Sequence, residues 1–178
     1  MRAMDADRAG EPSPPGRKTV STAILCVGRL KEKPMRQLAD EYLKRLGRYG
    51  KYEEIELPDL PEPEDGSPAL EKRVKTREGD AMLARVRPGD RVIALTIGGK
   101  GRSSEELAAH LKELRVSGCG RLVFLIGGSL GLGDNVLARA DEEMSMGPMT
   151  FPHQLARVML LEQLYRAEKI NAGERYHK

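Results

Sequence analysis

Residues 149–167 read MTFPHQLARVMLLEQLYRA, and this stretch predicts the helix that closes the fold. Pro152 is typical of a helix start, because the first helical residue needs no backbone N–H. Residues 158–161 are wholly apolar, so we expect the helix to pack against a buried partner. His153 and Arg157 lie one helical turn apart on the same face. This combination favours a functional site at the helix start, although a purely structural role for the histidine stays open.

Upstream of this helix, apolar strand-like runs alternate with helical patterns along the chain. Strands are predicted over 20–27, 53–57, 91–97 and 122–126, helices over 34–49, 69–86, 103–116 and 135–140, and strand or loop over 142–149. The run 122–126 is apolar throughout and bounded by glycine, as is typical of a strand buried on both faces. The alternation predicts an α/β fold with a mainly parallel sheet, in which ligands bind beyond the carboxyl ends of the strands.

Two glycine-rich segments, residues 98–101 and 127–133, follow predicted strands. Both are predicted as turns, where glycine permits positive φ and a close approach of the backbone to a ligand. Neither matches a phosphate-binding loop or a Gly-x-Gly-x-x-Gly dinucleotide motif. A tight turn and a ligand-binding loop therefore stay open for each segment. The methionines Met144, Met146 and Met149 leave a similar choice between core packing and an apolar wall for a flat heterocycle.

The composition indicates one domain with an extension, since the chain has 178 residues. Residues 1–18 are rich in proline, glycine and charge and are predicted to be a flexible leader, whereas 19–178 form the domain. The net charge of +3 carries no global polyanion-binding signature, and the absence of tryptophan argues against a base-stacking platform. No metal-ligand cluster, membrane span or secretion signal stands out, so we expect a cytoplasmic protein without a metal.

Four segments occur in an order and spacing that resemble the RlmH family. They are 125–132 (LIGGSLGL), 149–157 (MTFPHQLAR), 161–167 (LEQLYRA) and the terminal 176–178 (YHK). The family comprises bacterial large-subunit rRNA pseudouridine N3-methyltransferases of the SPOUT class, and the resemblance covers roughly residues 22–178. The resemblance implies a homodimer. It also implies a C-terminal trefoil knot, although knots are rare exceptions to the general rules of chain topology.

The resemblance also implies that S-adenosyl-L-methionine binds between the strand ends and the loop before the closing helix. The expected cofactor contacts are Leu95, Gly127, Met146, Gly147, Pro148, Met149, Thr150 and Phe151. The expected substrate is large-subunit rRNA, in the assembled ribosome.

Methylation of N3 requires that its proton leaves, so the site needs a base or must stabilise the imidate that forms. His153 and His177 are the candidate bases, Arg157 is expected to stabilise negative charge on the uracil oxygens, and Tyr176 is expected to position the target base. Two alternatives remain: a non-catalytic RNA- or ribosome-binding factor that keeps the fold, and a nucleotide-dependent α/β enzyme. The failed phosphate-loop patterns count against the second of these.

Overall fold

The computed structural model describes residues 20–176, so the predicted leader over 1–18 and His177 lie outside the described residues. Five strands form one sheet in the order β2-β1-β4-β3-β5, and every neighbouring pair is parallel. The strands are β1 (Ser21–Val27), β2 (Tyr52–Leu57), β3 (Asp90–Gly101), β4 (Arg121–Ile126) and β5 (Glu142–Ser145). The α/β fold with a mainly parallel sheet is therefore confirmed.

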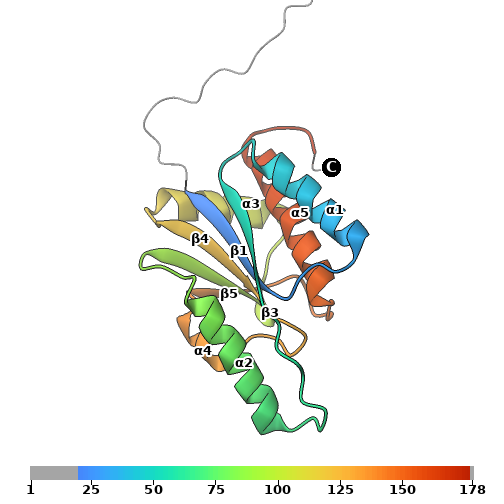
Figure 1. Ribbon diagram of the computed structural model, residues 1–178. Helices are drawn as coiled ribbons and strands as arrows, with labels where there is room; N and C mark the ends of the chain where they lie inside the picture. Colours follow the sequence, from blue (N-terminus) through green and yellow to red (C-terminus); the bar gives the residue numbers. More distant parts are fainter. Residues whose placement is uncertain (1–19, 177–178) are drawn as a thin grey trace, which may run out of the picture.

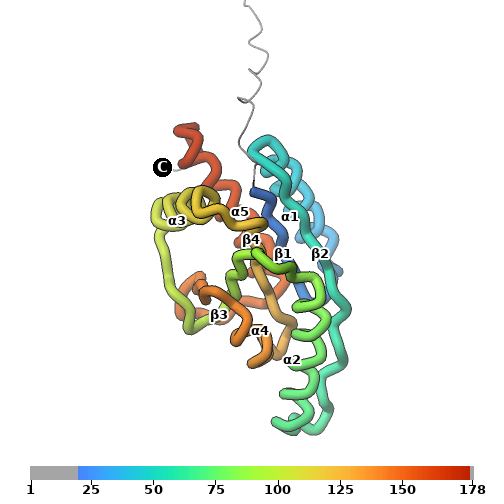
Figure 2. Tube along the Cα trace, turned by 90° about the vertical axis from the view of Figure 1, so that its left-hand side faces the viewer, coloured from blue at the N-terminus to red at the C-terminus, as the bar shows by residue number. Residues whose placement is uncertain are grey.

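Helices cover both faces of the sheet, as Figures 1 and 2 show from two directions. The helices are α1 (Lys33–Leu46), α2 (Pro68–Leu83), α3 (Ser104–Val116), α4 (Asp134–Arg139) and α5 (His153–Asn171). On one face α5 packs between α1 and α3, and on the other α2 packs against α4. Each face has its own apolar core, and β4 contributes alternate side chains to both because all its residues are buried. Helices that cover both faces explain why β4 is apolar throughout.

Local sequence explains where the elements begin. Ser103 caps α3 by accepting a hydrogen bond from the Glu106 N–H, and the Glu106 carboxylate accepts one from the Ser103 N–H. Pro152 is the residue directly before α5, where its missing N–H costs no helical hydrogen bond. Both helix starts agree with the predicted ones to within a residue.

The prediction of a turn over residues 98–101 is wrong. Strand β3 continues to Gly101, because its pairing with β5 is interrupted between Leu95 and Lys100 and then resumes. A Cβ atom added at Gly99 would lie 2.7 Å from the backbone nitrogen of Met144, closer than packed atoms approach. Glycine is needed at this position so that two strands can pack closely, and a ligand is not required to explain it.

Candidate functional site

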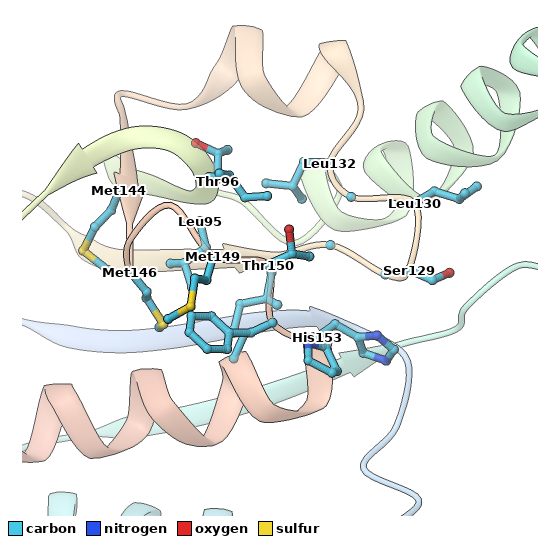
Figure 3. Close-up of a pocket in the computed structure, with 18 of the residues that line it drawn as sticks. Leu95, Thr96, Ser129, Leu130, Leu132, Met144, Met146, Met149, Thr150 and His153 are labelled. Carbon is cyan, nitrogen blue, oxygen red and sulfur yellow. The ribbon is translucent and has the colours of Figure 1, made fainter.

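A cavity of about 850 Å³ lies at the carboxyl ends of β3 and β4, between the glycine-rich turn 127–133 and the loop that precedes α5 (Figure 3). This is the edge of a parallel sheet at which ligands are expected to bind. All the predicted cofactor contacts line the cavity except Pro148, and His153 lines it as well. The structure thus brings together residues that are almost 60 positions apart in sequence, from Leu95 to His153.

The turn after β4 has a backbone shape that only glycine allows. A Cβ atom added at Gly127 would lie 2.6 Å from the carbonyl carbon of Gly131, and Gly131 itself has φ +82°. The Gly131 N–H donates to the Gly128 carbonyl oxygen at 3.0 Å, which closes the turn. Because Gly127, Gly128 and Ser129 also line the cavity, the segment is both a tight turn and a wall with exposed backbone groups.

The remaining walls are mainly apolar. The side chains that form them include Leu95, Leu132, Leu137, Met144, Met146 and Phe151. Met149 stands at the rim and is 68% exposed. The Ser145 hydroxyl holds the loop before α5, since it accepts a hydrogen bond from the Gly147 N–H at 3.1 Å and donates one to the Gly147 carbonyl at 3.0 Å. A volume of this size with apolar walls and a few polar backbone groups suits a nucleoside-sized ligand with a flat ring.

His153 is the first residue of α5 and lies at the mouth of the cavity, beside the chain that leaves β1 (Figure 3). A Cβ atom added at Gly28 would lie 3.4 Å from His153 Nε2 and 3.8 Å from Asp59 Oδ2. Burial lowers the pKa of His153 below its ordinary value, and the positive charges of Arg157 and Lys31 lower it further, while Asp59 acts in the opposite sense. The imidazole is therefore neutral at pH 7 and able to accept a proton.

Arg157 does not line the cavity. Its side chain is completely buried, and Nη1 donates to Glu54 at 3.1 Å and to Glu56 at 2.8 Å. Nη2 donates to the Gly28 carbonyl oxygen at 2.8 Å. These bonds attach the start of α5 to the ends of β1 and β2. The structure therefore gives Arg157 a framework position, and its guanidinium is not directed at a ligand in the cavity.

The two carboxylates that bind Arg157 were not predicted from the sequence. Glu54 and Glu56 are two residues apart on β2, so they project from the same face of the strand. That spacing was visible in the sequence, but two acidic residues on a short strand usually face solvent. Only the three-dimensional contact with α5 shows that they neutralise a buried cation.

Tyr176 also lies outside the cavity. Its ring packs edge-on against Tyr165, with the centroids 4.9 Å apart, and its hydroxyl donates to Glu162 at 3.1 Å. The Arg166 guanidinium lies over the same ring, 4.7 Å from its centroid. The contacts of Tyr176 on α5 run from Glu162 to Arg166, roughly 14–20 Å along the helix from His153. Tyr176 thus packs against the second half of α5, away from the cavity of its own chain, and His177 lies beyond the described residues.

Within residues 20–176, no group of three or more histidine, cysteine or acidic side chains is arranged to hold a metal ion. The helices of the described chain are also all too short or too polar to cross a membrane.

Comparison with known proteins shows to which family the chain belongs. A family described as "Predicted SPOUT methyltransferase" matches residues 20–177. The protein named "Ribosomal RNA large subunit methyltransferase H" from Alkaliphilus oremlandii (strain OhILAs) is 50% identical over 159 residues, which cover 89% of this chain and 100% of that protein. The protein of the same name from Exiguobacterium sp. (strain ATCC BAA-1283 / AT1b) is 49% identical with the same coverage.

Among solved structures, "a probable methylase family protein from Haemophilus influenzae Rd KW20" has a TM-score of 0.50 and 12% sequence identity to the chain. The match covers 89% of this chain and 70% of that one. At this identity the likeness supports the fold alone.

Proposed function

The chain belongs to the SPOUT methyltransferase family that includes the ribosomal RNA large subunit methyltransferases H, and from this premise we propose that it methylates large-subunit ribosomal RNA. The observation that carries the proposal is the cavity in which the glycine-rich turn, the loop before α5 and a neutral His153 meet. A protein that only bound RNA would not need a ligand cavity of about 850 Å³ beside a group that accepts protons.

We propose S-adenosyl-L-methionine as the cofactor, which when bound supplies a methyl group on a positively charged sulfur. The residues present fit this molecule. Leu95, Met144 and Phe151 offer apolar walls for the adenine ring, and the backbone of Gly127 and Gly128 is accessible for polar contacts. Because a side chain at Gly127 would collide with the backbone of Gly131, this wall keeps its shape only with glycine.

The proposed acceptor is N3 of a pseudouridine in the assembled ribosome. N3 carries a proton at neutral pH, so its lone pair becomes available only as the proton leaves. His153 is the group best placed to accept that proton, since it is neutral and lies at the cavity mouth. The apolar walls exclude water and hold the reacting groups in one orientation, which lowers the entropic cost of their approach.

Arg157 and Tyr176 take different parts in this proposal. We assign Arg157 to positioning, because it holds the start of α5 through Glu54, Glu56 and Gly28. A catalytic role for the tail requires the cavity of another protomer, because Tyr176 packs against the second half of α5 and does not line the cavity of its own chain. We therefore propose a homodimer in which the Tyr176–His177 tail of one protomer serves the cavity of the other.

The C-terminal trefoil knot and the action in the cytoplasm, where ribosomes are found, stay predictions. The alternative function is a non-catalytic RNA- or ribosome-binding factor. Calorimetry with S-adenosyl-L-methionine, followed by transfer of a labelled methyl group to ribosomes from cells that lack this chain, separates the two. Binding and transfer are expected. Ribosome binding without cofactor binding would favour the alternative.

A further inference from the structure

Three exposed cations follow β1: Arg29 and Lys31 in the segment before α1, and Lys33 at the first residue of α1. The exposed Glu32 lies between the last two, so residues 29–33 carry three positive charges and one negative charge. No ion pair to any of them occurs within residues 20–176, whereas Arg36, only three residues further on, pairs with Asp40 and Glu54. Leu30, between the first two cations, is buried and anchors the segment in the core. Three unpaired charges on an anchored segment are placed to receive an anion from solution.

This cationic segment is held in a fixed position relative to the cavity. The Leu30 N–H donates to Glu56 Oε1 at 3.1 Å, and Arg157 Nη1 donates to the same oxygen at 2.8 Å. Arg157 also binds the Gly28 carbonyl, one residue before Arg29. One buried guanidinium thus joins the cationic segment to the start of α5, so that the segment and His153 keep one relative position.

Of the three cations, Lys31 lies close enough to His153 to act on it. His153 Nε2 is next to Gly28, at the start of the segment, and the charge of Lys31 contributes to the lowered pKa of His153. Figure 3 shows His153 beside the chain that leaves β1. An anion bound by Lys31 would therefore lie near His153 and near any substrate that enters the cavity beside it.

The loop between β2 and α2 has the opposite charge. Its exposed acidic residues are Asp59, Glu62, Glu64 and Asp65. Asp59 and His153 both lie next to Gly28, so this acidic loop begins beside the start of the cationic segment. A polyanion at this position is attracted by the cationic segment and repelled by the acidic loop, so it is favoured to run along the cationic segment.

We propose that Arg29, Lys31 and Lys33 form a phosphate-binding ledge for the RNA strand that carries the target base. This inference rests on the proposed function and adds the path of the substrate. Phosphates next to the target nucleotide bind the ledge, the base enters the cavity past His153, and the acidic loop keeps the rest of the strand off the β2 side. Such contacts fix register and orientation and do not read sequence.

The test compares an Arg29→Ala/Lys31→Ala/Lys33→Ala variant with a Lys44→Ala/Lys112→Ala control. Lys44 and Lys112 are exposed cations without ion pairs among the described residues, on α1 and α3. Initial rates of methyl transfer to ribosomes from cells lacking this chain are measured over a range of salt concentrations. Binding of the same ribosomes is measured by sedimentation, and cofactor affinity by calorimetry.

The ledge variant is expected to raise KM for the ribosome and to weaken its salt dependence by about 0.7 in log–log slope for each phosphate that the ledge no longer binds. Cofactor affinity and the control variant are expected to match wild type. Unchanged KM, ribosome affinity and salt slope in the ledge variant would overturn the proposal. Absence of methyl transfer by the wild type would instead reject the proposed function, and the sedimentation measurement would still decide on the ledge.

Discussion

The Arg157 guanidinium donates to the Gly28 carbonyl oxygen at 2.8 Å and so joins the start of α5 to the end of β1. The same guanidinium neutralises Glu54 and Glu56, which lie about 100 residues earlier in the chain. His153 lies one helical turn before Arg157, next to Gly28, and lines the cavity. The geometry around the proposed base therefore depends on a residue that has no contact with the cavity.

The first prediction concerns this junction. Arg157→Ala removes the buried guanidinium from Glu54, Glu56 and the Gly28 carbonyl oxygen and leaves the two carboxylates with the partly exposed Arg36 alone. We expect a loss of about 3–5 kcal/mol in the free energy of unfolding. Arg157→Lys keeps the charge but cannot reach three oxygens at once and is expected to lose less. Urea denaturation measures both. Arg45→Ala, which removes an exposed helical pair with Glu41, is the control and should change stability far less. Wild-type stability in Arg157→Ala would contradict the framework role.

The second prediction concerns the glycine-rich turn. Gly127→Ala places a methyl group 2.6 Å from the Gly131 backbone, so the turn must open and the cavity wall is lost. We expect calorimetry to show no binding of S-adenosyl-L-methionine. Gly98→Ala is the matched control, because nothing lies within 4 Å of the added methyl group and its φ is not positive. Equal cofactor affinity in the two variants would show that the turn does not form the binding site.

The third prediction concerns pH. Since the pKa of His153 lies below its ordinary 6.5, kcat/KM should be constant above that pH and fall only at lower pH, as the base becomes protonated. Lys31→Ala removes a positive charge and should move the fall to higher pH, whereas Asp59→Asn should move it to lower pH. NMR titration of the imidazole checks both shifts directly. Identical pH profiles for the three proteins would mean that another group accepts the proton.

The same pKa shift affects stability. An imidazole that resists protonation in the folded chain takes up a proton more readily in the unfolded chain. The folded state therefore loses stability as the pH falls below 6.5, and the loss levels off below the folded pKa. His153→Gln should reduce this part of the pH dependence in urea denaturation. An unchanged pH dependence of unfolding would argue against a lowered pKa.

The fourth prediction concerns the tail. Deletion of residues 176–178 should abolish methylation and leave cofactor binding intact, because Tyr176 does not line the cavity. Mixing this truncated protein with His153→Ala protein should restore part of the activity, since a mixed dimer pairs an intact cavity with an intact tail from the other protomer. Subunit exchange is verified first. If the mixture then shows no recovery of activity, the tail does not act on the partner's cavity.

Local sequence patterns predicted most of the fold but few of the long-range contacts. Glycine, proline and apolar periodicity located the five helices and the first four strands of the described chain to within a few residues, and left residues 142–149 open between strand and loop. They failed at residues 98–101, because the resumed pairing of β3 with β5 depends on the distant Met144 and leaves no local signal. They also did not predict the partners of Arg157. The deciding contacts with Glu54 and Glu56 come from another part of the chain.

The most direct test of methylation is mass spectrometry of large-subunit rRNA from cells with and without this chain. We expect one methylated pseudouridine to disappear when the chain is absent. The wild-type chain is expected to restore this nucleotide, and the Gly127→Ala variant is not. Identical methylated nucleotides in the two strains would contradict the proposed function.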